Sequence, residues 1–231
     1  LEVRMVRDWK GSARGREGQA ITWVTPDKLL RYSMPPADLP VVAALRQPDR
    51  YLVTPEPLQG ADAWLGGIGA AIEGGSRRIH LRTPQTDDRV ALARHVAERF
   101  ASQVDVLLNR DIALARELGV GVHLGGEQLL SLSARPLPES QPVAASCHDL
   151  AQLQAAQRLG CDFVVLGPVQ PTATHPGAAP LGWEAFEQLR EQVSLPIYAI
   201  GGMAAADIET ARRDGALGVA AIRALWPSPT A

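Results

Sequence analysis

Lysine is almost missing from this sequence. Of the 23 basic residues in a chain of 231, only Lys10 and Lys28 are lysines, and none follows residue 28. A lysine Schiff base is therefore excluded from the rest of the chain, as is a phosphate site that depends on a lysine ammonium group. Chemistry that lies beyond residue 28 has to proceed without lysine.

Cysteine, net charge and long apolar runs are also scarce. Cys147 and Cys161 are too few for a disulfide framework, so a reducing cytoplasm is the expected compartment. A formal net charge of −2 and a pI near 6.2 give no electrostatic argument for nucleic acid or an anionic membrane as a partner. No apolar run approaches the roughly 20 residues that span a bilayer, and no signal peptide is visible.

From residue 50 onward, short aliphatic runs alternate with longer helical stretches. Strands are expected at residues 51–54, 78–82, 104–108, 121–124, 142–146, 163–166, 197–200 and 218–221. Helices are expected at residues 61–73, 87–101, 111–118, 127–132, 149–159, 183–192, 204–214 and 223–226. Eight βα units predict a parallel sheet, and eight is the number that closes a (β/α)8 TIM barrel with its site at the carboxyl ends of the strands. An open doubly wound sheet is the alternative, but near-continuous apolar strands favour closure.

Residues 1–49 have a different pattern. They hold both lysines, a Gly/Arg-rich turn and two β-like runs, Val3–Trp9 and Ala20–Val24, followed by a short helical stretch at 39–46. This set is too small for a domain of its own. We therefore expect two parts, a β-rich end of an upstream domain at 1–49 and the barrel at 50–231, in a piece cut from a longer chain.

Polar residues follow the second and third expected strands. His80 and Arg82 share one face of their strand because side chains alternate, and together they indicate anion recognition at the barrel mouth. A pair facing the helices at the rim is the alternative. Asn109 is placed to orient a polar ligand or, equally, to form a turn. His123, in the fourth strand, is expected to be buried and hydrogen-bonded.

The fifth strand ends in Ser146, Cys147 and His148. A histidine just beyond a strand end can exchange protons near neutral pH. Cys147 is not expected to act as a nucleophile with that histidine, because adjacent residues on a strand point to opposite sides. Asp149 is expected to cap the following helix, and Gly160 to end it.

The loops after the sixth, seventh and eighth strands predict a phosphate site. Hydroxyl and amide groups of the loop 167–177, which holds Thr172, Thr174 and His175, could wrap a phosphate; a rigid proline-rich connector is the alternative. Gly201 and Gly202 open a helix beside a short helix after the eighth strand, which is the common phosphate arrangement of barrels. Four of the five histidines fall near the mouth, but no His-x-His pair or carboxylate cluster accompanies them, so no metal site is expected.

Residues 50–226 resemble the thiamin phosphate synthase and thiazole tautomerase superfamily. The motifs that carry the resemblance are Tyr51-Leu52-Val53-Thr54, His80-Leu81-Arg82, Gly121-Val122-His123-Leu124-Gly125, Ser146-Cys147-His148, Gly167-Pro168-Val169-Gln170-Pro171-Thr172-Ala173-Thr174 and Ala199-Ile200-Gly201-Gly202-Met203. The resemblance implies a TIM barrel that binds a phosphorylated thiazole. The implied phosphate contacts are Gly167, Gly201, Gly202, Ala221 and Ile222.

The synthase branch joins a pyrimidine diphosphate to the thiazole phosphate, with magnesium and cations for the departing pyrophosphate. Its Gln-Leu-Arg-Glu-Lys motif matches residues 80–84, where Pro84 replaces the lysine. Its Asn-Asp metal pair matches Asn109 and Arg110, its second metal aspartate matches Gln128, and its second lysine matches His175. The resemblance therefore predicts little or no synthase activity, since lost carboxylates weaken magnesium binding.

The tautomerase branch moves a proton without metal or lysine, and its catalytic histidine matches His148. Sequence reasoning therefore favours a tautomerase that uses His148 as acid/base and needs no cofactor. The residues expected to contact its substrate are His80, Arg82, Asn109, Ser146, Thr172, Thr174 and His175. Two alternatives stay open: a synthase with an altered pyrophosphate site, and a non-catalytic module that binds a phosphorylated ligand and regulates a partner domain.

Residues 1–49 resemble the C-terminal part of a MutT-type Nudix hydrolase, the 8-oxo-dGTP pyrophosphohydrolase type. The matching segments are Trp9-Lys10-Gly11, Gly15-Arg16-Glu17-Gly18-Gln19, Trp23-Val24 and Met34-Pro35-Pro36-Ala37-Asp38. The Nudix catalytic box is missing, so this part is not expected to hydrolyse nucleotides. The resemblance implies an upstream Nudix domain as partner, with Mg²⁺ confined to that missing segment or to any surviving synthase activity. A homodimer is a further expectation.

Overall fold

The computed structural model describes residues 6, 8–45, 47–56, 60–83, 88–172, 177 and 179–227. The chain divides into two compact units, Leu1–Gln47 and Pro48–Ala231. Among the described residues, no helix is long and apolar enough to cross a membrane.

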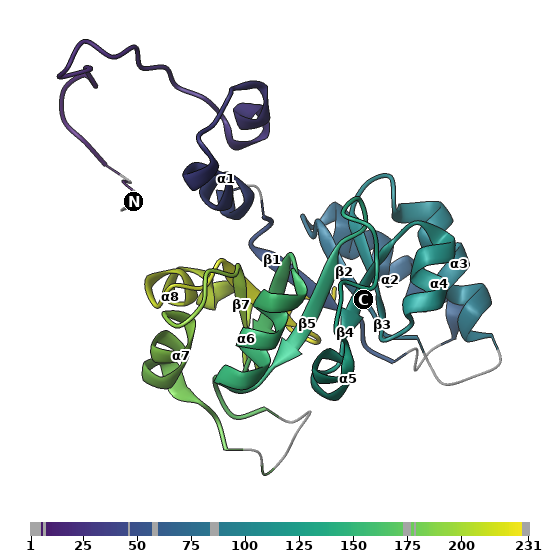
Figure 1. The fold of residues 1–231 in the computed structure, drawn as a ribbon. Coiled ribbons are helices and arrows are strands. Elements are labelled where there is room, and N and C mark those ends of the chain that lie inside the picture. The colour runs from purple at the N-terminus through teal and green to yellow at the C-terminus, as the bar shows by residue number, and fades with distance from the viewer. Residues whose placement is uncertain are drawn as a thin grey trace. The chain divides into compact units, whose positions relative to one another are not determined.

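The second unit is a closed parallel barrel in which neighbouring strands follow the order of the chain (Figure 1). Its strands are β1 (Arg50–Val53), β2 (Arg78–Leu81), β3 (Asp105–Asn109), β4 (Gly121–Leu124), β5 (Val143–Cys147), β6 (Phe163–Leu166), β7 (Ile197–Ile200) and β8 (Gly218–Ala221). The ring closes where Leu52 of β1 pairs with Ala221 of β8. The prediction of a (β/α)8 TIM barrel is confirmed, and the open sheet is excluded.

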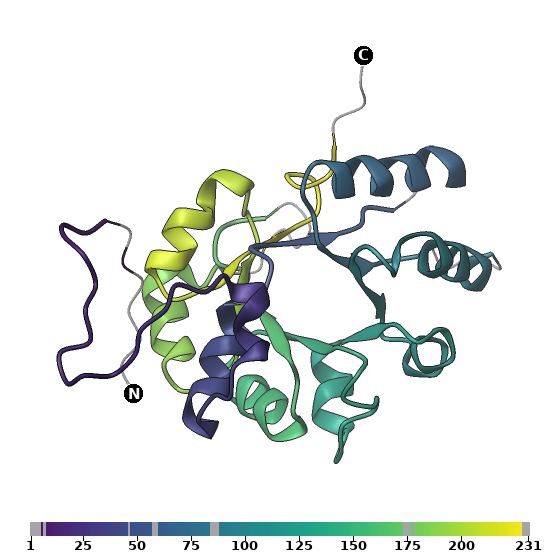
Figure 2. The same cartoon turned by 90° about the horizontal axis from the view of Figure 1, so that it is seen from above.

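Helices lie outside the ring of strands (Figure 2). They are α2 (Ala61–Glu73), α3 (Arg89–Phe100), α4 (Ile112–Leu118), α5 (Gly126–Ser131), α6 (Leu150–Leu159), α7 (Gly182–Arg190), the 3-10 helix η3 (Ala205–Asp207) and α8 (Ile208–Arg213). As expected, the Asp149 carboxylate caps α6 by accepting from the Gln152 N–H at 2.8 Å, and Gly160 ends it in the left-handed region.

Two helices near the carboxyl end of the chain differ from the prediction. The stretch 204–214 is not one helix but η3 followed by the six-residue α8. The stretch 223–226 forms only a turn, in which the Trp226 N–H donates to the Ile222 and Arg223 carbonyls. Four residues form little more than one helical turn, and Pro227 disfavours helical geometry at the residue before it.

The barrel interior is packed rather than open. Aromatic and aliphatic side chains from alternate strand positions, including Tyr51, Phe163 and Tyr198, fill it. At the amino end of the strands, buried Arg78 lies 4.0 Å above the Phe163 ring and donates to Asp105 at 2.6 Å. A larger cluster fills the space between strands and helices.

The first unit contains the 3-10 helices η1 (Pro26–Arg31) and η2 (Pro36–Asp38) and the helix α1 (Leu39–Leu45). Its described residues include no strand, so the expected β-run at Ala20–Val24 is wrong; most of Val3–Trp9 lies outside the described residues. A lone pair of strands is marginal in water without a face to pack on. Trp23 is 75% exposed and stacks on Trp9, at 5.3 Å between ring centroids. The resemblance to a Nudix hydrolase gains no support from this fold.

Candidate functional site

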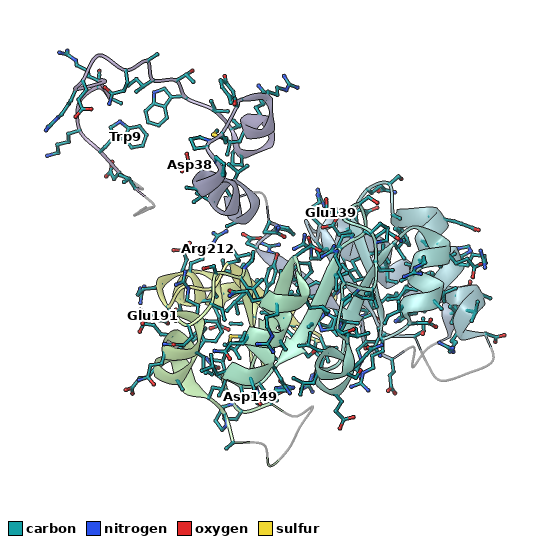
Figure 3. All side chains as sticks on the ribbon, in the orientation of Figure 1. Trp9, Asp38, Glu139, Asp149, Glu191 and Arg212 are labelled. Atoms are coloured by element: carbon teal, nitrogen blue, oxygen red, sulfur yellow. The ribbon has the colours of Figure 1, made fainter. Side chains whose placement is uncertain are left out.

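One cavity of about 640 Å³ lies at the carboxyl ends of the barrel strands. The residues that line it follow or end β1 to β8, so every strand contributes. Asp149, labelled in Figure 3, lies at this end of the barrel, whereas Arg212 and Glu139 lie at the opposite end. The volume is within the range of roughly 300–1,000 Å³ typical of small-molecule sites.

Most of the residues selected from the sequence line this cavity. They are His80, Arg82, Asn109, Ser146, His148, Gly167, Thr172, Gly201, Gly202, Ala221 and Ile222. Thr174, His175 and Pro84 lie outside the described residues. The fold therefore brings together candidates that are up to 142 positions apart in the chain, from His80 to Ile222.

Two arginines and one histidine of the cavity were not selected from the sequence. Arg110 and Arg223 line it, and so does His123, which was expected to be buried and hydrogen-bonded only. Strand alternation would turn Arg110 away from the face of Asn109, but its φ of 62° breaks the alternation. The sequence did carry a signal for Arg110, because this arginine directly follows Asn109, a candidate residue at the end of a strand.

Two stacked imidazoles form the floor of the cavity. The His80 and His123 rings lie 4.0 Å apart between centroids and 16° from parallel. His80 Nε2 donates to Asn109 Oδ1 at 3.1 Å. His123 is hydrogen-bonded on both nitrogens, to the Tyr51 hydroxyl at 3.0 Å and to the Ser146 hydroxyl at 2.9 Å. This network fixes the orientation of both rings.

The two floor histidines are uncharged at neutral pH. Burial lowers the pKa of His80 to about 3, and the charges of Arg82 and Arg110 act in the same direction against the hydrogen bond to Asn109. Burial, with the neighbouring charges of His80 and Arg110, also lowers the pKa of His123 well below its ordinary value. The floor is therefore polar but electrically neutral.

His148 lies at the rim of the cavity, where its ring is fixed by the backbone. Nδ1 donates to the Gly167 carbonyl, and the His148 N–H donates to Gln152 Oε1 at 2.8 Å. Because a carbonyl only accepts, Nδ1 carries a proton, and Nε2 of the neutral ring is the acceptor. Cys147 points the other way into the outer cluster, where burial raises its thiol pKa. Cys147 and His148 therefore lie on different sides of the strand end, as strand alternation predicts.

The glycine pair on the cavity wall is required by close packing. Gly201 and Gly202 have φ of 93° and 70°. A Cβ on Gly201 would lie 2.5 Å from Pro168 Cβ, and one on Gly202 would lie 2.7 Å from Gln170 Cβ. The loop after β6 is hydrogen-bonded to this segment through the Val169 N–H and the Ile200 carbonyl at 2.8 Å. The long helix expected at 204–214 after this glycine pair is absent. The cavity wall is therefore formed by glycine backbone rather than by the start of a long helix.

The cavity carries positive charge and, among the residues described, no carboxylate. Arg82, Arg110 and Arg223 line it, and in the described part of the chain none of the three is in a salt bridge. No Asp or Glu is among its described lining residues, and no described group of three His, Cys, Asp or Glu could hold a metal ion. Magnesium prefers carboxylate oxygens. The described donor set therefore does not fit the magnesium site that the synthase branch implies.

Comparison with known proteins gives a consistent result. The family described as "Thiamine monophosphate synthase" matches residues 50–225. A "Putative thiamine-phosphate synthase" of Geobacter sulfurreducens is 33% identical over 186 residues, 78% of this chain and 87% of the relative. A "Thiamine-phosphate synthase" of Chloroflexus aurantiacus is 33% identical over 181 residues, 76% of this chain and 83% of the relative.

The fold comparison and the names of the relatives bear on different predictions. The thiamine phosphate pyrophosphorylase of Pyrococcus furiosus covers 75% of this chain and 85% of its own, with a TM-score of 0.63 and 22% identity, and so supports the fold. The tautomerase interpretation of the sequence is contradicted by the relatives, which are named synthases. With residues 50–225 matched, this chain belongs to the thiamine monophosphate synthase family.

Proposed function

We propose that the barrel is a transferase of the thiamine-phosphate synthase type, which joins a pyrimidine diphosphate to a thiazole phosphate. The observation that carries this proposal is one cavity that brings together three arginines from the ends of separate strands. Arg82 and Arg110 follow β2 and β3, whereas Arg223 follows β8. Two anionic substrates that react with each other need two such places in one cavity.

The wall formed by the ends of β6, β7 and β8 is the place for the thiazole phosphate. Gly167, Gly201 and Gly202 leave backbone without side chains there, and Ala221 and Ile222 follow on the next strand. Glycine backbone lets a phosphate approach N–H groups closely. Arg223, which sequence reasoning missed, adds a cation beside this wall.

The reaction makes one bond and breaks one. The thiazole ring nitrogen bonds to the methylene carbon of the pyrimidine, and the bond from that carbon to the diphosphate oxygen breaks. The electron pair leaves with the diphosphate, so negative charge grows on the leaving group and positive charge on the carbon. Arginines stabilise the former. The neutral imidazoles of His80 and His123 provide polar contact without repelling the latter.

The proposal is tested by supplying the full chain with both precursors and measuring thiamine phosphate by mass spectrometry. We expect product from the unaltered chain, and from Arg158→Gln, which removes an exposed arginine from α6 as a matched control. Arg223→Gln should raise the KM for thiazole phosphate by roughly tenfold or more, because a charge-assisted contact is lost.

Binding of both precursors with no product would contradict the proposal. It would support a second candidate function, a non-catalytic module that binds phosphorylated ligands, which the carboxylate-free lining of the described cavity favours. Isothermal titration of each precursor separates this result from a simple failure to bind.

A further inference from the structure

Arg110 is held over the cavity by an unusual local structure. It is the one described residue other than glycine with a positive φ, 62°, a conformation that is strained for an L-residue. Its N–H donates to the His123 carbonyl at 2.8 Å, and its own carbonyl accepts from Gln128 Nε2 at 3.0 Å. The backbone is thus fixed on both sides of the side chain.

The guanidinium group of Arg110 occupies space that a glycine leaves open. A Cβ on Gly125 would lie between 2.6 and 2.8 Å from Nε, Cζ and Nη2 of Arg110. Any other residue at position 125 would therefore displace the guanidinium group. Gly125 itself lines the cavity, so this packing sets the Arg110 side chain against the cavity wall.

Arg110 and Arg82 lie near the same buried ring. Both line the same cavity as His80, and the charge of each adds to burial in lowering the pKa of that ring against the hydrogen bond to Asn109. Neither is in a salt bridge within the described residues, and the described lining of the cavity offers no carboxylate to neutralise them. Two such cations in one cavity favour an anion with more than one charged group.

We propose that Arg110 and Arg82 form a subsite that binds a diphosphate without magnesium. The identification of the ligand rests on the proposed function, which supplies a diphosphate as leaving group. The donor set supports it, because guanidinium groups bind phosphate oxygens directly and in pairs, whereas a metal ion would need carboxylates that the described lining lacks. The wall formed by the glycines at the ends of β6 and β7 and by the end of β8, here called the glycine wall, binds the monophosphate of the thiazole in this arrangement.

The test is isothermal titration of the full chain with inorganic pyrophosphate in EDTA, with thiazole phosphate already bound so that the glycine wall is occupied. We expect pyrophosphate to bind in EDTA, and magnesium added in place of EDTA not to strengthen the binding, because magnesium itself chelates pyrophosphate and competes with a metal-free site. Arg110→Gly should weaken binding by roughly tenfold to a hundredfold. Glycine accepts φ of 62°, so this variant should melt at or above the temperature of the unaltered chain.

Arg158→Gln serves as the matched control and should bind pyrophosphate normally. Binding that requires magnesium, or that is equal in Arg110→Gly and the unaltered chain, overturns the proposal. Because no turnover is measured, the result is independent of the coupling reaction. Arg110-dependent binding in EDTA supports the subsite even if coupling fails, whereas no binding of pyrophosphate in EDTA refutes the subsite even if coupling proceeds.

Discussion

At the residue scale, the cavity floor combines groups that the sequence presents separately. His80 and Arg82 could be selected because strand alternation places them on one face. The stack of His80 on His123 could not be predicted, because it depends on two strands that are not neighbours in the barrel. Arg110 could not be selected in this way, because strand alternation predicts that its side chain points away from the cavity. Its positive φ turns the side chain toward the cavity instead.

The neutral floor has a consequence for stability. The pKa of His80 falls from 6.5 to about 3 on folding, so between these values the unfolded chain binds a proton that the folded chain does not. Stability should therefore decrease as the pH falls through this window, by about 1.4 kcal/mol per pH unit for one proton. Between pH 7 and pH 5, the free energy of unfolding of His80→Gln should fall by about 2 kcal/mol less than that of the unaltered chain.

Urea unfolding at pH 7, 6 and 5 measures this difference. His95→Gln, which removes an exposed histidine from α3, is the control for a general effect of losing a histidine. Equal pH dependence in His80→Gln and the unaltered chain would show that His80 is not held neutral by the fold.

At the element scale, the eight strands and most helices could be predicted to within a residue or two, because periodicity and the capping residues Asp149 and Gly160 mark them. The failures lie where tertiary contacts decide. The stretch Ala20–Val24 has a β-like composition but no sheet to join. The glycine pair predicts a helix start from the sequence, whereas the structure requires it for packing against the loop after β6.

The packing at the glycine pair predicts an unequal response to alanine. Gly202→Ala should destabilise the barrel by about 2–4 kcal/mol, because a left-handed residue becomes strained and its Cβ overlaps Gln170 and Pro171. Gly160→Ala has a similar φ of 75° but meets nothing within 4 Å, so it should lose only about 1–2 kcal/mol. Thermal or urea unfolding compares the two, and equal losses would remove the argument for close packing.

At the scale of the whole molecule, the barrel could be predicted with its site at the carboxyl ends, but the branch of chemistry could not. The same lost lysines and carboxylates that favoured a tautomerase also fit a synthase whose anion site is built from arginine. Single residues in the sequence do not show that Arg82 and Arg110 lie near one histidine. The phosphate contacts, the acid/base role of His148 and the Nudix-like origin of residues 1–49 stay predictions.

The barrel should be a complete folding unit from residue 48 onward. The Asp49 carbonyl accepts from the Val219 N–H at 3.0 Å, and the Pro48 carbonyl accepts from the Tyr198 hydroxyl. A fragment of residues 48–231 should therefore unfold cooperatively, whereas residues 51–231 should be less stable by about 1–3 kcal/mol. Urea unfolding of the two fragments checks this, and identical midpoints would mean that the contacts of Pro48 and Asp49 add nothing.

The central claim is that this carboxylate-poor, arginine-lined cavity performs the coupling reaction of its family. The most direct measurement is the initial rate at which the full chain forms thiamine phosphate and pyrophosphate, from EDTA through increasing magnesium. The account predicts both products in equal amounts already in EDTA, and a much lower rate for Arg110→Gly. Absence of product at every magnesium concentration, with both precursors bound, would contradict it.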